Sequence, residues 1–582
     1  MLSIIVSLAI VSLIHHLTHD PITVISWDVY GYYLYLPAIF KYGDWGNYAF
    51  AVEHLNQYYI SSDLYQLMDW KGEKAPIYTL GMAVLYAPFY FISDMVASLT
   101  SYPADGMSQP YQWGIVVASW FYMGVGIYFL NRLLEALKFT WSTRIWTLAA
   151  IICGSNYFHY VVYENGMSHT YLFSLYAVLL YYTHRWHTEA KLSYIVISGL
   201  CISLLCIARP SEVISLIIPI FYGVYNGLTF LIKRHRLLNN YKQILVFSVV
   251  GISIVFIQVG FWKFSQGDWI FNGYSGHHFD FMSPHIWDGL FSFRKGWLIY
   301  SPVFIISILG FIQLYREERR WFWALTVFSV VNIYIVLSWH IWWYASSYGM
   351  RALIQSYAIL AIPMALFLRW SQKHKWAKMA TRIFILLCIC LNQFQDWQYR
   401  NGILLQDGMN AMFYSRSFLK TSVDKDLRKF IDNPEEYSGG NENTVIEKIT
   451  FEKQNLDTVI LDKPAVTVLP GAYGPTIKVK VTDNGPADSW LHGSGMFYSN
   501  SEQFTAYKQA RFVLSHSRNG DNLKWRGIHI QRIIDVGKWN DFGFDFCLDQ
   551  GYNIGDQIEM TLWNRGPDTL YINQVSLSKY RE

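Results

Sequence analysis

The sequence predicts a polytopic α-helical membrane protein with an all-β sandwich at its C-terminal end. Of its 582 residues, 53% are hydrophobic and only 15% are charged, whereas soluble domains average about 25% charged residues. Apolar runs of roughly 17 to 20 residues, long enough to cross a bilayer, recur through about the first 400 residues. After about residue 441 the pattern becomes alternating and β-branched, which is typical of strands.

Eleven apolar runs indicate about eleven membrane spans. They are residues 1–19, 113–131, 145–162, 168–183, 193–208, 213–231, 243–262, 297–314, 321–338, 352–369 and 382–396. The loops between them alternate, because one set is rich in Lys and Arg and the other in Trp, Tyr, His and Gly. Basic loops face the cytoplasm. We therefore expect a multi-pass protein of the cytoplasmic (inner) membrane, with its N-terminus inside and its C-terminus outside.

The apolar run 76–99 does not fit this alternation, since a crossing there would turn every later basic loop outward. We therefore expect a juxtamembrane or re-entrant element on the outer side, packed against protein. The predicted domains are a membrane domain at 1–396, with 20–112 as its first outer loop, and an extracytoplasmic β-sandwich at 441–582. A linker with a short helix is expected between them, at 397–440.

The side chains suited to chemistry gather in the predicted outer loops. Asp28 follows the first span. Placing a charged carboxylate at the edge of a membrane costs free energy, which indicates that Asp28 has a function. Aromatic faces stack on sugar rings, while Arg and Lys pair with phosphate. By this chemistry the further binding candidates are Tyr32, Asp44, Glu53, Lys74, His169, Arg209, His340, Tyr348 and Arg351. Glu164 lies in another outer loop without an assigned role.

Plainer interpretations compete at several positions. Trp339, Trp342 and Trp343 also fit an interfacial aromatic belt. Arg351 also fits a side chain that snorkels to the interface. Asp28 also fits a helix N-cap or the partner of an arginine.

Two motifs in the first outer loop resemble GT-C glycosyltransferases, most closely the bacterial aminoarabinose transferases and protein O-mannosyltransferases. Asp28-Val29-Tyr30-Gly31-Tyr32, with Gly43-Asp44-Trp45 beginning fifteen residues after Asp28, is similar to their catalytic Asp, Tyr and Gly-Asp-Trp. Lys74-Ala75-Pro76-Ile77-Tyr78 is similar to their Lys-Pro-Pro-Leu-Tyr motif. Val29 stands where the family often has an acidic residue, and Ala75 replaces the first proline, which leaves the donor type open.

The β-rich tail lies outside that resemblance. It resembles carbohydrate-binding jelly-roll domains, whose last strands often read like Leu562-Trp563-Asn564 and Leu570-Tyr571-Ile572-Asn573. Its role, whether binding an acceptor or shielding a cavity, stays open.

The resemblance to GT-C enzymes implies an active site at the outer face of the membrane. It implies transfer of a hexosyl or pentosyl group from a polyprenyl-phosphate carrier to a lipid, glycan or protein acceptor of the cell envelope. Asp28 is then expected to be the general base that takes the acceptor proton. Lys74 is the first candidate for the donor phosphate, followed by Arg351 and Arg209.

No cofactor follows with certainty. Asp44 and Glu53 are expected to orient the acceptor, or to hold a divalent metal ion if the reaction uses one. Membrane lipids are expected partners. Nucleic acid is not, because the Lys and Arg residues behind the formal charge of +4 reflect membrane topology rather than nucleic-acid binding.

Two other functions stay open. An oligosaccharide ligase using a pyrophosphate carrier is the nearest enzymatic alternative. A transporter of lipid-linked sugars would place ionisable residues near the bilayer midplane, where the predicted spans have few.

Overall fold

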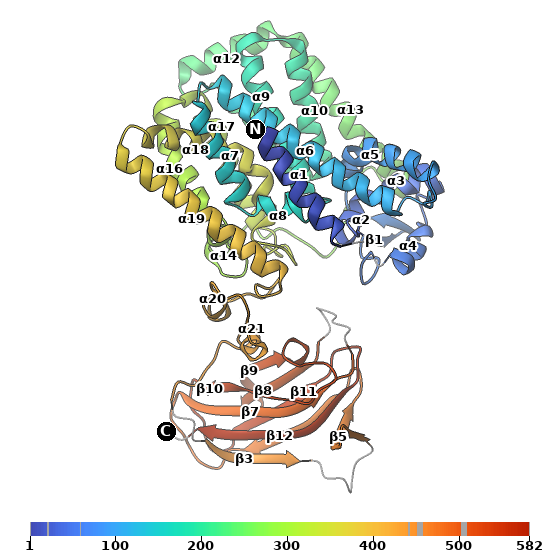
Figure 1. The fold of residues 1–582 in the computed structure, drawn as a ribbon, viewed down its shortest axis with the longest axis vertical. Helices are drawn as coiled ribbons and strands as arrows, with labels where there is room; N and C mark the ends of the chain where they lie inside the picture. The colour runs from blue at the N-terminus through green and yellow to red at the C-terminus, as the bar shows by residue number, and fades with distance from the viewer. Residues whose placement is uncertain are drawn as a thin grey trace. The chain divides into compact units, whose positions relative to one another are not determined.

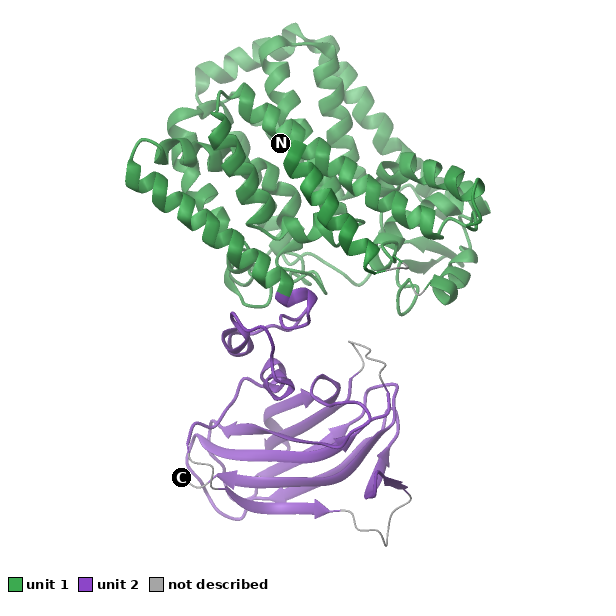
Figure 2. Ribbon diagram, viewed as in Figure 1, with its two compact units in different colours: residues 1–397 green, residues 398–582 purple. Residues whose placement is uncertain are grey.

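The chain folds into a helical unit and a β unit (Figure 1). The computed structural model describes residues 2–19, 22–58, 60–439, 443–450, 458–501 and 509–580. Its two compact units are residues 1–397 and 398–582 (Figure 2). A helical protein with a C-terminal β domain is therefore confirmed. The predicted boundary between residues 440 and 441 lies outside the described residues.

The helical unit contains many helices of very different length and a small hairpin, β1 (Leu67–Trp70) and β2 (Glu73–Pro76). The helices before residue 200 are α1 (Leu2–Leu17), α2 (Trp27–Tyr33), α3 (Tyr35–Pro37), the π-helix η1 (Ala38–Tyr42), α4 (Phe50–Tyr58), α5 (Gly81–Ser98), α6 (Gln109–Ala136), α7 (Trp141–Cys153), α8 (Tyr157–Val162), α9 (Ser168–Glu189) and α10 (Leu192–Ala208). Those that follow are η2 (Pro210–Leu216), α11 (Ile217–Phe221), α12 (Gly227–Asn239), α13 (Tyr241–Gln266), α14 (Ile286–Phe291), α15 (Trp297–Tyr300), η3 (Pro302–Phe304), α16 (Ile305–Glu317), α17 (Arg319–Leu337), η4 (Arg351–Ser356), α18 (Tyr357–Ser371) and α19 (Lys375–Arg400).

Six helical stretches among the described residues are long and apolar enough to cross a membrane: α5, α6, α13, α17, η4 with α18, and α19. Shorter apolar helices are α1, α10 and the stretch from η2 to α11. The predicted count of eleven spans is not confirmed. The run 76–99, predicted to be juxtamembrane or re-entrant, contains α5, which has Pro88 inside it.

Three predicted spans are interrupted in the structure. The run 145–162 divides into α7 and α8, and 297–314 divides at Ser301-Pro302, where proline cannot continue the hydrogen-bond ladder. The run 213–231 ends its first helix at Phe221, and Asn226 then caps α12 by accepting a hydrogen bond from Thr229. Apolar composition alone therefore overstated the continuity of these segments.

The degree of burial separates central from peripheral helices. Most side chains of α9 are buried, and α9 packs against α6, α10, α18 and η4. By contrast, only Gln258, Ser265 and Gln266 are buried in α13. A helix enclosed on all sides belongs to the protein core, and an exposed apolar helix suits a lipid environment.

The β unit is a two-sheet sandwich, as predicted. Its strands are β3 (Asn443–Thr450), β4 (Thr458–Ile460), β5 (Lys463–Val468), β6 (Tyr473–Lys480), β7 (Ser489–Tyr498), β8 (Arg511–Arg518), β9 (Asp521–His529), β10 (Asn540–Leu548), β11 (Gln557–Trp563) and β12 (Leu570–Tyr580). One sheet has the order β10-β7-β12-β5-β4, with β3 also paired to β12, and the other has the order β6-β11-β8-β9. Alternate side chains such as Phe497, Phe512 and Met560 meet in one core. The short helices α20 (Ala411–Ser417), η5 (Lys425–Arg428) and α21 (Lys429–Asp432) precede the strands.

Candidate functional site

Two glycines allow α2 to pack closely where it presents Asp28. A Cβ atom on Gly31 would lie 2.4 Å from the ring of Tyr78. A Cβ atom on Gly166 would likewise lie 2.4 Å from a methyl group of Val29. Because glycine lacks this atom, Tyr78 and the loop before α9 can both approach α2. These two contacts fix the position of Asp28 in the first turn of the helix.

The carboxylate of Asp28 accepts three hydrogen bonds. Its Oδ1 accepts from the hydroxyl groups of Tyr65, at 2.8 Å, and Tyr78, at 2.7 Å. Its Oδ2 accepts from Nη2 of Arg351 at 3.1 Å, and the Asp28 side chain is 22% exposed. An ionised carboxylate has about four lone-pair sites. Among the described residues, Oδ2 accepts a single hydrogen bond, so this oxygen has capacity for one more donor.

The surroundings keep Asp28 ionised. Burial by itself would raise the pKa of Asp28. The positive charge of Arg351, the two phenol hydrogen bonds and the charge of Arg209 outweigh burial and lower that pKa. The site therefore presents a stable anion beside two guanidinium groups. Asp28 does pair with an arginine, as the alternative interpretation expected. This pairing is compatible with a role in binding.

Arg209 adds a second cation to the same region. It follows the last residue of α10 and donates a hydrogen bond to Tyr32. The ring of Tyr32 packs edge-on against Tyr78, with 4.6 Å between centroids. Tyr274 also packs against Tyr78, at 6.0 Å. Two cations, a carboxylate and several phenols therefore belong to one connected group of side chains.

His169 lies in a buried polar network behind the arginines. Its Nδ1 is 3.3 Å from Oε1 of Gln355, whose Nε2 donates to Glu212 at 3.0 Å. Tyr176 donates to the other oxygen of Glu212. Within the part of the chain that the structure describes, Nε2 of His169 has no hydrogen-bond partner. Since His169 is completely buried, the structure places it in a supporting layer rather than on a surface open to a ligand.

Lys74 and Asp44 have local partners instead of joining Asp28. Nζ of Lys74 lies 2.7 Å from Oδ1 of Asp69, across the β1–β2 hairpin, and its side chain is 44% exposed. The two carboxylate oxygens of Asp44 accept from the backbone N–H groups of Asn47, at 2.9 Å, and Ala49, at 2.7 Å. The Asp44 side chain therefore stabilises the turn that follows it.

Three other predicted residues also lie apart from the Asp28 contacts. Glu53 is exposed in the first turn of α4. His340 stacks on His278 and has its Nε2 3.2 Å from Nδ1 of His277. Tyr348 is buried and donates to the backbone oxygen of Asn392 at 3.1 Å. Of the predicted residues, Arg351 therefore contacts Asp28 directly, whereas Tyr32 and Arg209 are related to it through Tyr78 and through charge. His169 belongs to a neighbouring buried network.

Sequence analysis missed the two phenols that hold Asp28. Tyr78 is the last residue of the Lys74–Tyr78 motif, so the motif pointed to the right segment but the lysine was selected. Tyr65 lies just before β1 and belongs to no recognisable pattern. Only the folding of the first loop back over α2 brings its hydroxyl to Asp28.

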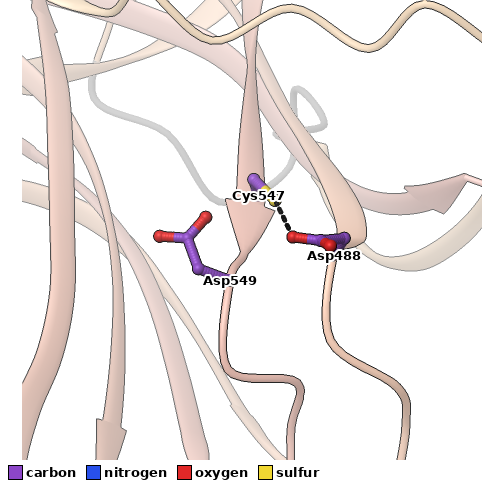
Figure 3. A group of neighbouring side chains, drawn as sticks. All are labelled: Asp488, Cys547 and Asp549. Atoms are coloured by element: carbon purple, nitrogen blue, oxygen red, sulfur yellow. Dashed lines mark hydrogen bonds between the residues drawn. The ribbon is translucent and has the colours of Figure 1, made fainter.

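A metal site is not formed around Asp28 by the described residues. Among them, the one group of three side chains spaced to share an ion is Asp488, Cys547 and Asp549 in the β unit (Figure 3). Sγ of Cys547 lies 3.8 Å from Oδ1 of Asp488. The carboxylate of Asp549 already pairs with Nζ of Lys524 at 2.9 Å. A cation there would face that ammonium group, so this cluster does not fit a metal ion.

Comparison with known proteins gives only distant likenesses. No protein-family model matches the chain, and no curated protein matches it significantly. Among solved structures it is similar to the archaeal oligosaccharyltransferase AglB from Archaeoglobus fulgidus in complex with an inhibitory peptide and a dolichol-phosphate. That match has 13% identity and a TM-score of 0.41, over 71% of this chain and 57% of that chain.

Two further structures are similar at the same low level. An apo-form oligosaccharyltransferase of Archaeoglobus fulgidus gives 14% identity and a TM-score of 0.40, over 71% of this chain and 57% of that chain. The arabinosyltransferase EmbB from Mycobacterium smegmatis gives 8% identity and a TM-score of 0.32, over 85% of this chain and 59% of that chain. The chain thus aligns with a little over half the length of each. At these TM-scores the likenesses decide neither activity nor substrate.

Proposed function

We propose that this protein is a GT-C-like membrane glycosyltransferase that moves a sugar from a polyprenyl-phosphate carrier to an acceptor at the outer face of the membrane. The observation that favours it most is the Asp28 carboxylate, which keeps one acceptor site open beside Arg351 and close to Arg209. A transferase of this kind needs a base for the acceptor and cations for the departing phosphate.

Each group at the site has a role in the proposed reaction. The acceptor hydroxyl or amine donates a hydrogen bond to the open site on Oδ2 of Asp28, and Asp28 takes its proton as the nucleophile attacks the anomeric carbon. The bond from that carbon to the phosphate oxygen breaks, and its electron pair stays with the phosphate. Arg351 and Arg209 stabilise the added charge. Attack opposite the leaving group inverts the anomeric centre.

The geometry changes the order of the phosphate candidates. Arg351 and Arg209 lie with Asp28, whereas Lys74 is paired with Asp69. We therefore put the two arginines before Lys74 as phosphate ligands. Two guanidinium groups would also suit a diphosphate, which keeps the oligosaccharide ligase with a pyrophosphate carrier as the second candidate.

Transfer of radiolabelled sugar by the purified full-length protein tests this function. Wild type, Asp28→Asn and the control Asp288→Asn would be compared with polyprenyl-phosphate donors and crude envelope as acceptor. Asp288 is a suitable control because its side chain is 52% exposed on α14. We expect transfer by wild type and the control, and a loss of about 10³-fold for Asp28→Asn.

The other outcomes are equally informative. Full transfer by Asp28→Asn would overturn Asp28 as the base. Transfer from polyprenyl-pyrophosphate donors alone would replace the proposed function by the ligase. No transfer from either donor class by folded protein would overturn the transferase and favour a transporter.

The proposed orientation has its own test. Tyr102 is 49% exposed in the segment between α5 and α6. In a cysteine-free background, Tyr102→Cys is expected to react with a membrane-impermeant maleimide from outside intact cells. Labelling only after the cytoplasm is opened would contradict an outer first loop and the juxtamembrane or re-entrant assignment of 76–99.

A further inference from the structure

The sheet β6-β11-β8-β9 of the β unit has a row of aromatic and basic side chains at one end, and β9, β8 and β11 lie together in Figure 1. In the register of these strands, Trp563 pairs with Tyr473 on one side and with Arg511 on the other. Arg511 in turn pairs with His529. Successive side chains of a strand point to opposite faces, and Leu562, next to Trp563, is buried in the sandwich core. The row therefore lies on the face turned away from that core.

Two aromatic rings of this row form an exposed platform. The rings of Tyr473 and Trp563 are nearly parallel, with 9° between their planes and 5.8 Å between their centroids. Tyr473 is 65% exposed, and Trp525, on the same face of β9, is 38% exposed. Leaving such large apolar surfaces in water costs free energy. A sugar ring, whose face carries apolar C–H groups, can cover them by stacking.

Two guanidinium groups lie over aromatic rings of the same face. Cζ of Arg565 is 4.7 Å from the ring centroid of Trp563, and Cζ of Arg511 is 5.6 Å from that of Trp525. Nε of Arg511 donates a hydrogen bond to Nε2 of His529 at 2.9 Å. Across the residues that the structure describes, neither arginine forms an ion pair, and the Nη groups of both make no hydrogen bond. Both arginines can therefore donate to a ligand.

Other arginines of the β unit differ because they bind carboxylates. These pairs are Arg518 with Asp556, Arg526 with Glu435 and Arg532 with Asp432. Burial lowers the pKa of Arg511, and the positive charge of Arg565 lowers it further, while Asp432 opposes both effects. An anion between Arg511 and Arg565 would relieve this repulsion and accept from their Nη groups.

A buried-side contact fixes the orientation of Arg511. Because Nε2 of His529 accepts from Arg511, the ring proton of a neutral His529 is on Nδ1. Nδ1 lies 2.8 Å from Oδ1 of Asp432 and donates to it. Asp432 and His529 therefore hold Arg511 by its Nε and leave its two Nη groups for a ligand.

We propose that this face of the β unit is a binding site for an acidic saccharide. A sugar ring lies on Tyr473 and Trp563, and its carboxylate or phosphate group accepts hydrogen bonds from the Nη groups of Arg511 and Arg565. A neutral glycan would leave both guanidinium groups without a partner. The inference goes beyond the proposed transferase function, because it assigns a ligand to the other unit and needs no transfer reaction.

The binding of two small sugars to the purified full-length protein tests the role of charge. Digalacturonic acid and its dimethyl ester have the same rings and differ in the charge of their carboxyl groups. Isothermal titration calorimetry measures both Kd values without donor or turnover. We expect the ester to bind about tenfold more weakly than the acid. Equal affinities for the acid and the ester would overturn an anionic ligand.

Glucose 6-phosphate distinguishes the two kinds of anion. Tighter binding of the phosphate than of digalacturonic acid would assign the anionic group as a phosphate, and the reverse order would assign it as a carboxylate. In both cases the proposal requires that binding depends on Arg511. Folded wild-type protein that binds neither sugar would overturn the site.

Arg511→Gln and Arg565→Gln are compared with the matched control Lys538→Gln, which also removes one positive charge. Lys538 is exposed just before β10, a strand of the other sheet. We expect each arginine variant to bind the acid about tenfold more weakly and the control to match wild type. An equal loss in the control would show general attraction to a basic protein and would overturn the site.

Tyr473→Leu tests stacking separately from charge. The change removes the ring and no charge, so we expect it to weaken binding of the acid and of the ester by the same factor, about fivefold. Unchanged binding of both sugars would overturn the platform as part of the site. The melting temperature of each variant reports whether it is folded.

Hydrogen exchange of the wild-type protein locates the ligand without any substitution. Saturating digalacturonic acid is expected to slow exchange in β8 and β11. Slower exchange confined to the helical unit, where Arg209 and Arg351 could also bind an anion, would overturn the location. Since binding is measured without transfer, a protein that transfers no sugar but shows this protection would overturn the transferase and leave the saccharide site standing.

Discussion

Asp28 in the helical unit and Asp556 in the β unit both pair with an arginine, but their surroundings differ. Asp556 precedes β11 in the β unit and is 1% exposed. Its Oδ1 accepts from Nε of Arg518 at 2.9 Å, and its Oδ2 contacts Nη2 of Arg518, Nε2 of His516 and the N–H of Asn553 at 2.8 to 3.0 Å. Three residues therefore make four hydrogen bonds with this almost fully buried carboxylate. This carboxylate therefore has a structural role.

Asp28 differs from Asp556 in its exposure and in the chemistry of its partners. It has three partners, is 22% exposed and lies among phenols and guanidinium groups rather than backbone amides. An arginine partner alone does not identify a candidate functional site, because both aspartates bind an arginine. Access from solvent makes the distinction, since Asp28 is 22% exposed and Asp556 only 1%.

Replacing each aspartate by asparagine should separate the two roles. We expect Asp28→Asn to lose about 10³-fold of transfer activity, with a smaller loss of stability than Asp556→Asn because Asp28 is the more exposed of the two. Asp556→Asn should retain activity and destabilise the β unit by about 2 kcal/mol, because a buried charge-assisted network loses its anion. Hydrogen exchange of β8 and β11 in the full-length protein measures the second effect. Equal loss of stability in both variants would break the comparison.

The pH dependence of the same exchange sharpens this contrast. Hydrogen bonds from Arg518, opposed by burial, lower the pKa of Asp556. Its stabilising contribution is therefore complete above the ordinary aspartate pKa of about 3.9 and is lost progressively below it. In Asp556→Asn this acid sensitivity should be smaller. An unchanged acid response would show that Asp556 is not its source.

Gly31→Ala tests whether close packing of α2 sets the Asp28 geometry. The added methyl group would meet the ring of Tyr78 at 2.4 Å, so the ring must move away from Asp28. We expect about a 30-fold loss of transfer and a destabilisation of about 1 to 3 kcal/mol, as in other overpacked sites. As a control, Gly260→Ala adds the same methyl group where nothing lies within 4 Å. Similar losses in both variants would contradict a specific packing role.

Tyr78→Phe removes one of the two phenol donors without changing the ring. The phenol hydrogen bond helps to lower the pKa of Asp28, so its removal should raise that pKa and move the acidic limb of the rate profile to higher pH. A hydrogen bond to a charged group contributes about 1.5 kcal/mol or more, and we expect about a tenfold loss of kcat/KM at neutral pH. The profile of kcat/KM against pH provides the measurement. A limb that moves to lower pH would contradict this account.

Lys74→Ala should have the smallest effect. Because Lys74 is half exposed and paired with Asp69, we expect the donor KM to rise by only about threefold and the melting temperature to stay constant. Asp69→Ala is the informative partner, since it frees the ammonium group. If Lys74 binds donor phosphate, Asp69→Ala should lower the donor KM. Identical small effects in both variants would indicate that Lys74 only stabilises the β1–β2 hairpin and does not bind the donor.

Local sequence patterns were sufficient to predict the two-part architecture, and they pointed to the segment that contains the candidate site. Composition and apolar runs predicted the helical unit, and alternating β-branched runs predicted the sandwich, because burial of one face imposes a period on the chain. The order Asp28, Gly-Asp-Trp, Lys74–Tyr78 also pointed to the first loop. These features depend on neighbours in the chain, so a single sequence contains them.

Which of the candidate side chains contact one another depends on how the chain folds in three dimensions. Arg351 lies 323 positions after Asp28, and Tyr65 reaches the same carboxylate through a loop with no repeating pattern. Lys74 and Asp44, which the motifs emphasised, instead have local partners. The contacts of His159 with Asp396 of α19 and with Glu164 of the loop after α8 could not be predicted from the sequence either. Such contacts depend on how distant helices pack, and no local period or spacing in the sequence encodes that.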